Sequence, residues 1–281
     1  MNILIIGSSG ILGYHLYNDL RKKHNVYHTG LKKRLCDLTI KENLKKILNK
    51  KLDVVINCSA ITSIDFAEKN KKTTNDINYK LVKNILVLNK TKKFYFINFS
   101  TDQVYNSKNV RKNIEPNVSF FKNYYTKTKI KADKLTNKFK FLCLRVNFFG
   151  KSFKGKGTFT DWLFLKSKTK ETIFLFEDQF ISGITINSLS NIVSKVLSKK
   201  IFGIYNVGSN GYVSKKNLAI KFYKTLNLNK KIKFKSIKVN KFLKVKRSNF
   251  MFMNCNKFQN KFNIKLPDIN KEIKKAAYQY K

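Results

Sequence analysis

The chain has 281 residues, enough for one large or two smaller domains, and its 59 lysines and arginines against 16 aspartates and glutamates give a formal net charge of +43. Only five of the basic residues are arginines, and the lysines are spread through every segment. Ala, Gly and Pro are scarce, whereas Lys, Asn, Ile and Phe are abundant, which is the composition expected from an A/T-rich coding sequence. Composition therefore argues against a dedicated nucleic-acid interface, and we expect no specific nucleic-acid partner.

The chain opens with a predicted strand, a glycine turn and a helix. Asn2–Ile6 is largely apolar and is typical of a buried strand, and the amphipathic stretch Tyr14–Lys22 predicts a helix. Gly7 permits a tight turn, Gly10 lets backbone N–H groups approach a pyrophosphate, and Gly13 lets the helix pack closely on the strand. The sequence predicts a dinucleotide site whose cofactor-binding residues here are Gly7, Ser9, Gly10, Ile11, Leu12 and Gly13.

The end of the second predicted strand favours one nicotinamide dinucleotide over the other. An acidic residue at this place would hold the adenosine ribose hydroxyls of NAD. Val26–Gly30 contains no carboxylate, and Lys32, Lys33 and Arg34 follow, so a 2′-phosphate would meet positive charge. We predict NADPH as the cofactor, with NADH as the alternative, and we assign Arg34 to cofactor binding.

Two pairs of residues further along predict the chemistry. Ser100 and Thr101 end a strand-like run, and Tyr125 and Lys129 are four residues apart, so they share one face of a helix. A phenol titrates near ~10 in water, and a neighbouring ammonium favours the phenolate, which brings the phenol closer to working pH. Tyr125 could then donate a proton to a carbonyl oxygen, and this arrangement predicts a reductase.

Longer segments around these residues resemble the extended short-chain dehydrogenase/reductase family and, within it, the dTDP-4-dehydrorhamnose reductase branch. Asn78 falls where the family has an asparagine. The similar segments are Asp53–Glu68, Phe99–Tyr105, Asn123–Lys129 and Leu144–Gly150, with a looser likeness at Phe176–Asp178, Gly203–Gly208 and Lys246–Asn254.

Strands alternate with helical stretches through about Val146, which predicts an α/β protein with a Rossmann-type doubly wound parallel sheet. The later part predicts helices at Thr160–Lys168 and Ile184–Ser198, and the resemblance implies that the second of these returns to the nucleotide domain. We therefore expect an NADP-binding domain of residues 1–146 plus about 184–207. A smaller, interleaved C-terminal substrate domain would comprise about 147–183 plus 208–281.

The resemblance also implies residue roles. Thr101, Tyr125 and Lys129 would be catalytic, and Lys129 would also hold the nicotinamide ribose. Further cofactor contacts would come from Asp37, Leu38, Ser59, Ala60, Thr62, Tyr125 and Lys129. The substrate-binding residues would be Ser100, Thr101, Asp102, Tyr125, Asn147, Trp162 and Arg247. The implied reaction is NADPH-dependent reduction of the C4 keto group of a nucleotide-linked 4-dehydro-6-deoxy sugar, for deoxysugar and surface polysaccharide biosynthesis.

The chain departs from the branch at several positions. Thr126 and Thr128 stand where glycine and serine are usual, no proline follows Arg247, and Gln103 replaces a tyrosine. Sugar-nucleotide 4,6-dehydratases of the family place a glutamate at the position of Gln103 to move a proton, which an amide cannot do. The departures therefore argue against a dehydratase and leave the identity of the sugar open.

Three alternatives remain open from the residues alone. A sugar-nucleotide epimerase of the same family would use the same tyrosine and lysine. A non-catalytic NADP-binding regulatory subunit would share the scaffold, and it would copurify with a partner enzyme. A polyanion-binding protein would bind tightly even at physiological salt.

Metal and membrane sites are not predicted. The four cysteines and three histidines have no metal-ligand spacing, and we expect no metal site. No apolar stretch reaches the ~18 residues of a membrane-spanning helix, and the chain enters a strand within its first residues, so we expect a cytoplasmic protein without a membrane partner. The sequence is compatible with a homo-oligomer.

Overall fold

The computed structural model describes residues 1–30, 37–169, 171–228 and 232–281. The chain divides into two compact units. Unit 1 comprises Met1–Thr101, Phe121–Arg145 and Val193–Tyr205, and unit 2 comprises Asp102–Phe120, Val146–Ile192 and Asn206–Lys281. The units are interleaved along the chain, and they are nearly equal in length because Asp102–Phe120 belongs to unit 2.

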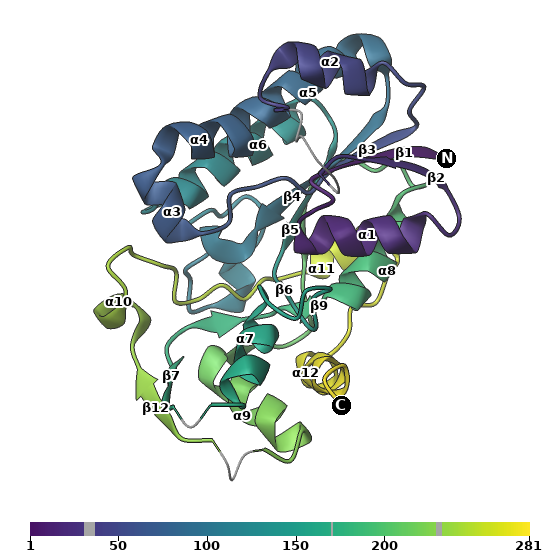
Figure 1. The fold of residues 1–281 in the computed structure, drawn as a ribbon. Helices are drawn as coiled ribbons and strands as arrows, with labels where there is room; N and C mark the ends of the chain where they lie inside the picture. Colours follow the sequence, from purple (N-terminus) through teal and green to yellow (C-terminus); the bar gives the residue numbers. More distant parts are fainter. Residues whose placement is uncertain (31–36, 170, 229–231) are drawn as a thin grey trace. The chain divides into compact units, whose positions relative to one another are not determined.

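A six-stranded sheet in the order β10-β5-β4-β3-β1-β2 organises unit 1. β1 pairs in parallel with β2 and with β3, and β3 pairs in parallel with β4 (Figure 1). The strands are β1 (Asn2–Ile6), β2 (Asn25–His28), β3 (Val54–Asn57), β4 (Tyr95–Thr101), β5 (Leu142–Val146) and β10 (Gly203–Val207). Helices alternate with these strands, which confirms the predicted doubly wound α/β architecture.

Side chains of β1 alternate between two buried faces, as a strand covered on both sides requires. Leu4 and Ile6 join a core cluster with side chains of α2 (Lys41–Leu48), α5 (Leu81–Lys92) and α6 (Tyr124–Lys138). Ile3 and Ile5 are also buried and point to the opposite face, where α1 (Ile11–Leu20) lies (Figure 1). Burial on both faces explains why this strand lacks the alternating polar residues of a half-exposed strand.

The ends of three helices refine the predicted ranges. α1 spans Ile11–Leu20, so it begins before the predicted start at Tyr14, because the turn Gly7–Gly10 leads directly into its first residue. α7 (Phe159–Lys166) agrees closely with the predicted Thr160–Lys168. α8 (Ile186–Val196) is preceded by a short strand, β9 (Ile184–Thr185), within the range predicted as helix.

Further short elements complete unit 1 between β3 and α5. They are α3 (Ile64–Lys69), α4 (Lys71–Asn75) and the π-helical turn η1 (Asp76–Lys80). Ser63 caps α3 through a hydrogen bond from Phe66 N to its Oγ.

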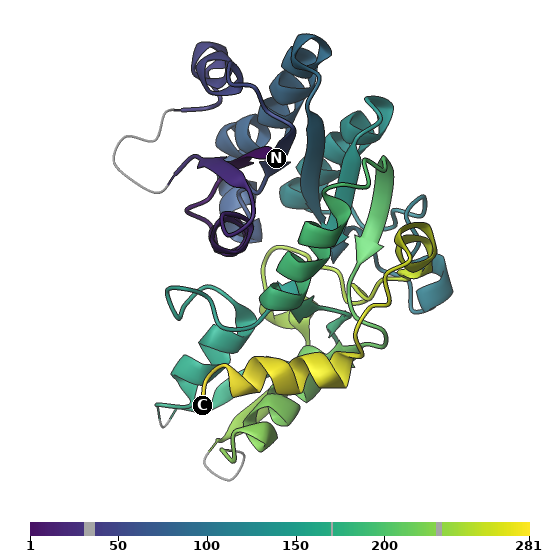
Figure 2. The same cartoon turned by 90° about the vertical axis from the view of Figure 1, so that its right-hand side faces the viewer.

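Unit 2 combines short strands with helices around its own core. α12 (Ile269–Tyr278) packs against α9 (Lys215–Thr225) (Figure 2), and both contribute side chains to one apolar cluster with β7 (Ile173–Phe176). The 3₁₀ turns are η2 (Asp102–Val104) and η3 (Val110–Lys112); the remaining strands are β6 (Phe148–Phe149), β7 (Ile173–Phe176), β8 (Phe180–Ile181), β11 (Val213–Ser214) and β12 (Phe234–Ile237). The remaining helices are α9 (Lys215–Thr225), α10 (Val239–Phe242), α11 (Asn256–Phe262) and α12 (Ile269–Tyr278).

Candidate active site

The glycine turn after β1 has backbone geometry that only glycine fits at two positions. Gly7 has φ +83°, and a Cβ there would lie 2.7 Å from Ser59 N. A Cβ on Gly13 would lie 2.3 Å from the carbonyl oxygen of Gly7, because the first turn of α1 packs directly on the loop. Gly7 is therefore required by the tight turn, and Gly13 by the close packing of the helix on that turn.

Thr29, at the end of β2, holds this turn in place. Gly7 N donates to Thr29 Oγ1 at 3.2 Å, and Ser8 donates to the Thr29 carbonyl oxygen from its N at 2.9 Å and from its Oγ at 2.6 Å. The sequence analysis missed this residue. Its signal was a hydroxyl at the end of the second strand, directly beside the strand that leads into the glycine turn.

A pocket of about 770 Å³ opens at the carboxyl ends of β1, β2 and β3. After β1 the chain continues to β2 at one side of the sheet, and after β3 it continues to β4 at the other side, so the strand order reverses between β1 and β3. Doubly wound sheets bind ligands at such a switch point. Six predicted cofactor-binding residues line the pocket: Gly7, Ser9, Asp37, Leu38, Ser59 and Ala60. The pocket is also lined by residues that the sequence analysis did not assign, among them His28, Thr29, Gly30 and Ile61.

The other predicted cofactor-binding residues either do not line this pocket or lie outside the described residues. Gly10, Ile11, Leu12 and Gly13 form the turn and the first turn of α1, and Thr62, Tyr125 and Lys129 do not line this pocket. Arg34, to which we assigned the 2′-phosphate, lies outside the described residues.

Asp37 is fixed by a local hydrogen-bonded turn. Its Oδ1 accepts hydrogen bonds from Thr39 N at 2.9 Å and from Thr39 Oγ1 at 2.6 Å. These bonds lower the pKa of the Asp37 carboxyl below its usual value, so the group is an anion at neutral pH. A carboxylate on the pocket wall can accept hydrogen bonds from an amino or hydroxyl group of a ligand.

The end of β4 carries the two predicted hydroxyl groups. Ser100 and Thr101 are both buried, at 6% and 4% exposure. Ser100 Oγ has no hydrogen-bond partner within the described parts of the chain. A buried hydroxyl without a protein partner is free to bond a ligand or an ordered water.

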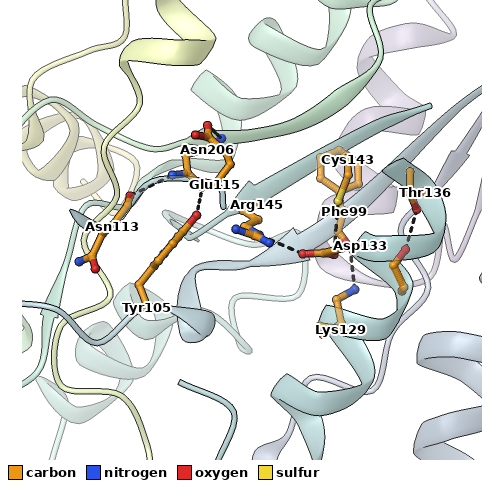
Figure 3. Close-up of polar contacts among 11 residues, drawn as sticks. Phe99, Tyr105, Asn113, Glu115, Lys129, Asp133, Thr136, Cys143, Arg145 and Asn206 are labelled. Atoms are coloured by element: carbon orange, nitrogen blue, oxygen red, sulfur yellow. Dashed lines mark hydrogen bonds and ion pairs between the residues drawn. The ribbon is translucent and has the colours of Figure 1, made fainter. Parts of the chain in front are cut away.

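α6 carries Tyr125 and Lys129 on one buried face. Asn123 caps the helix by accepting a hydrogen bond from Thr126 N at 2.9 Å, so Tyr125 lies in the first turn. Tyr125 is 7% exposed and Lys129 is 3% exposed. The Lys129 ammonium donates to the carbonyl oxygen of Phe99 at 2.6 Å (Figure 3), which ties the helix to β4 close to Thr101.

Burial sets the charge balance at Lys129. Removal from water lowers the pKa of the ammonium, and the nearby Asp133 carboxylate opposes that effect. Asp133 lies four residues further along α6, on the same helical face. The lysine that the sequence predicts to be catalytic is therefore buried, and the pKa of its ammonium depends on the Asp133 carboxylate.

Asn78 and Thr128 connect the loop after β3 to the same helix. Asn78 accepts from Ile61 N at 2.8 Å, and its Nδ2 donates to Ile61 O and to Thr128 Oγ1 at 3.1 and 3.2 Å. Thr128 was one of the departures from the branch, and its hydroxyl also donates to Tyr125 O at 2.8 Å. Threonine in place of the usual serine therefore keeps a hydroxyl at position 128, and this hydroxyl hydrogen-bonds the backbone of Tyr125.

Unit 2 contains the remaining predicted substrate residues. Asn147 Nδ2 donates to Asp102 Oδ2, so these two lie together. Trp162 is partly exposed on the wall of a pocket of about 440 Å³ that is lined mainly by aromatic and aliphatic side chains of α7, β7 and α10. Arg247, in the segment after α10, is half-buried, and its backbone N donates to Oδ1 of Asn240 within that helix.

Lys215, at the start of α9, is a further functional candidate that the sequence analysis missed. It lines the same pocket as Trp162, and its ammonium lies 5.5 Å from the centroid of the Phe159 ring. Burial lowers its pKa to about 8, with Asp102 acting in the opposite direction. No sequence signal could have singled out this lysine among so many.

Metal and membrane features are absent from the part of the chain that the structure describes. Residues 1–30, 37–169, 171–228 and 232–281 contain no group of three or more His, Cys, Asp or Glu side chains that could hold a metal ion. Within the same residues, no helix is both long enough and apolar enough to cross a bilayer.

Comparison with solved structures shows what the fold is similar to. The dTDP-4-dehydrorhamnose reductase of Bacillus anthracis str. Ames, in complex with NADP, has a TM-score of 0.89 and 20% sequence identity over 100% of this chain and 99% of that chain. A dTDP-4-dehydrorhamnose reductase from Clostridium acetobutylicum has a TM-score of 0.89 and 22% identity over 100% and 99% of the two chains. UDP-glucose 4-epimerase from Thermotoga maritima has a TM-score of 0.84 and 15% identity over 100% and 98%. At these identities the likeness shows a shared fold, which reductases and epimerases have in common.

The family is shown by the sequence itself. No curated protein matches the chain. The family model described as the RmlD substrate binding domain matches residues 1–281, the whole chain. The chain therefore belongs to the RmlD substrate binding domain family, in agreement with the resemblance of its motifs to the extended short-chain dehydrogenases/reductases.

Proposed function

We propose that the protein is an NADPH-dependent reductase that acts on the C4 keto group of a nucleotide-linked 4-dehydro-6-deoxy sugar. The observation that carries this proposal is that one compact unit contains the glycine turn with its pocket and also Thr101, Tyr125 and Lys129. Family membership and the similarity to reductase structures, one of them in complex with NADP, support the reaction class and the cofactor.

The residues at the turn fit a dinucleotide. Gly10 is the N-cap of α1 and has no side chain to cap the helix, and no acidic residue lies in the first turn, so the positive end of the helix dipole is not offset there. A Cβ at Gly7 or Gly13 would fill the space that the backbone needs. We propose that Gly7, Ser9, Gly10, Ile11, Leu12 and Gly13 hold the pyrophosphate, and that Asp37, Leu38, Ser59, Ala60 and Thr62 hold the adenosine side.

His28, rather than a carboxylate, stands on the pocket wall at the end of β2. A carboxylate there would favour ribose hydroxyls and repel a 2′-phosphate. The uncharged or cationic imidazole and the basic residues that follow support NADPH over NADH, and Arg34 stays our assignment for the 2′-phosphate.

The side chains of α6 and β4 would supply the proton and stabilise charge. When bound, NADPH supplies the hydride for the carbonyl carbon. Tyr125 donates a proton to the carbonyl oxygen, the Lys129 ammonium favours the resulting phenolate and holds the nicotinamide ribose, and Thr101 hydrogen-bonds the same oxygen. Each of these contributions accelerates such reactions by about 10²-fold or more.

The pocket in unit 2 is our candidate for the nucleotide part of the substrate. Trp162 and Phe159 stack 5.7 Å apart at an interplanar angle of 16°, and they offer flat apolar surface to a base. Lys215, which lines this pocket, offers a cation for the diphosphate. Arg247 does not line the pocket, and it stays a second candidate for the diphosphate. We place the reaction in deoxysugar and surface polysaccharide biosynthesis, because 6-deoxy sugars linked to a nucleotide are donors for glycan assembly.

A panel of turnover assays tests this function. Purified protein is mixed with NADPH and dTDP-4-dehydro-6-deoxyglucose together with a 3,5-epimerase, and loss of the absorbance of the reduced nicotinamide is followed; the assay is repeated with NADH and with other 4-keto sugar nucleotides. We expect turnover with at least one of these sugars and faster turnover with NADPH. Binding of NADPH without turnover on any of them would contradict the reductase assignment and favour an epimerase or a regulatory subunit.

A further inference from the structure

A buried ion pair lies next to Lys129 on the side of the helix that faces the sheet. Asp133 Oδ2 lies 2.9 Å from Nε of Arg145, which comes from β5, and both side chains are almost fully buried, at 1% and 2% exposure (Figure 3). Asp133 Oδ1 accepts a hydrogen bond from Cys143 Sγ at 3.3 Å. The carboxylate is therefore held by two groups of β5 while it remains one helical turn away from Lys129.

We propose that Asp133 is a positioning residue for the reduction proposed above: its carboxylate keeps the buried Lys129 ammonium charged beside Tyr125, and Arg145 and Cys143 fix that carboxylate in place. This inference rests on the proposed function for its consequence in catalysis. The electrostatic link between Lys129 and Asp133 itself does not depend on any substrate.

The need for such a partner follows from the surroundings of Lys129. A lysine at 3% exposure loses most of its hydration, and its hydrogen bond to the Phe99 carbonyl oxygen does not offset a full positive charge. Burial lowers the pKa of the ammonium, and Asp133 is the first of the groups that raise it again. Without the carboxylate, a larger share of Lys129 would be neutral at working pH, and a neutral amine does not stabilise a phenolate.

Other titratable groups around Lys129 do not replace this carboxylate. Cys58, after β3, and Cys143, on β5, also act on it, but burial raises both thiol pKa values, so both are neutral at working pH. The carboxylates on elements packed against α6 have their own partners: Glu68 accepts from Tyr124 N at 2.8 Å, and Asp76 lies 2.8 Å from Lys80 Nζ.

The same elements carry further charged and titratable groups. On α6 these are Tyr124, Tyr125, Lys127, Lys131, Lys134 and Lys138. On the neighbouring helices they are Asp65, Tyr79 and several exposed lysines, and on β4 the group is Tyr95, whose pKa burial raises. The lysines add positive charge, which works against a protonated Lys129.

The pH dependence of turnover distinguishes this role from a purely structural one. We compare the wild type with Asp133→Asn, Arg145→Gln and, as a matched control on a neighbouring element, Asp76→Asn. In Asp133→Asn, the alkaline limb of the kcat profile should move to lower pH by about one unit or more, because a unit charge at helical i, i+4 spacing is lost in a low-dielectric site. Arg145→Gln keeps the carboxylate, so its alkaline limb should not move to lower pH, and Asp76→Asn should match the wild type.

Two results would overturn the proposal. One is an unchanged alkaline limb in Asp133→Asn. The other is an equal downward shift in Arg145→Gln, which would show that loss of the ion pair, rather than of the carboxylate beside Lys129, is what matters. Asp133→Glu should restore the wild-type profile at least in part, because it returns the charge.

A stability cycle tests the link without any assay of turnover. Urea unfolding is measured for Lys129→Met, Asp133→Asn and the double variant. We expect the two substitutions to be non-additive by about tenfold or more in the unfolding constant. Asp133→Asn should be less harmful once Lys129 is gone, although Arg145 loses the Asp133 carboxylate in both backgrounds. If Asp133→Asn yields little folded protein, the double variant should yield more, because only Arg145, and not Lys129 as well, is then a buried cation that has lost the Asp133 carboxylate.

Additive effects, or a double variant as unstable as Asp133→Asn, would contradict the link. A wild type that turns over no sugar nucleotide but shows the expected non-additivity would refute the proposed function and leave the electrostatic coupling intact. The two failures are therefore distinguishable.

Discussion

Substitution of Gly13 by alanine tests the fit of the glycine turn most sharply. Alanine is favoured over glycine inside a helix by about 1 kcal/mol, so an unconstrained site in α1 would become more stable. In this structure the added Cβ would lie 2.3 Å from Gly7 O and 2.9 Å from Ser8 Cα. Both neighbours are backbone atoms, so the turn itself must move, and overpacking of this kind costs about 1 to 3 kcal/mol.

We therefore expect Gly13→Ala to lower the free energy of unfolding by up to about 2 kcal/mol, the overpacking cost less the helix-propensity gain, where propensity alone predicts a more stable protein. NADPH affinity should fall by about tenfold or more, equivalent to ~1.4 kcal/mol, because the displaced turn carries the N–H groups proposed for the pyrophosphate. Urea unfolding and fluorescence titration with NADPH measure the two effects.

Gly155→Ala is the matched control. A Cβ there would meet nothing within 4 Å, although its φ of +63° makes alanine unfavourable by about 1 kcal/mol or more. The control should lose similar stability and keep the wild-type affinity for NADPH. If Gly13→Ala is as stable as the wild type and binds NADPH equally well, the close packing of α1 on the turn is not what selects glycine.

Three other substitutions have expected outcomes. Lys215→Met should weaken binding of the nucleotide sugar, whereas the control Lys216→Met should not. In the wild type, affinity for the sugar nucleotide should fall as the pH rises through about 8, because Lys215 is a cation below its pKa and neutral above it. Titration calorimetry across that range measures this affinity, and an affinity that does not change with pH would contradict the role of Lys215. Asn78→Ala should lower the free energy of unfolding, measured in urea, by about 1 to 3 kcal/mol, since it leaves the backbone N and O of Ile61 without their partner. An unchanged midpoint of urea unfolding would mean that water replaces the amide. Asn123→Ala should lower the free energy of unfolding by about 0.5 to 2 kcal/mol, because the N-cap of α6 is lost, and it should slow turnover because α6 carries Tyr125. Asn123→Asp keeps a hydrogen-bond acceptor and should be close to the wild type. Equal losses of stability in the two variants would argue against capping.

Local sequence patterns predicted the parts of this structure that depend on local rules. The run Asn2–Ile6 had to be a buried strand, and the glycines after it had to be a turn, because these conclusions follow from side-chain periodicity and from backbone sterics. The spacing of Tyr125 and Lys129 placed both on one helical face for the same reason.

Residues that act through tertiary contacts could not be found in this way. Thr29 holds the glycine turn only because parallel pairing brings the end of β2 beside β1. Asp133 matters because burial makes Lys129 need a carboxylate, and burial is not readable from a helix rich in lysines. Lys215 differs from its neighbour Lys216 by the pocket that it lines, whereas Lys216 lies 3.6 Å from Glu177.

The central claim is that Tyr125 delivers the proton in an NADPH-dependent reduction. Its most direct test is turnover of a 4-keto sugar nucleotide by the wild type and by Tyr125→Phe, with NADPH affinity measured on both proteins. We predict that the substitution lowers kcat by about 10²-fold or more while NADPH binds as in the wild type, because it removes one hydroxyl and keeps the ring. Normal turnover by Tyr125→Phe would contradict the assignment of this tyrosine and, with it, the proposed mechanism.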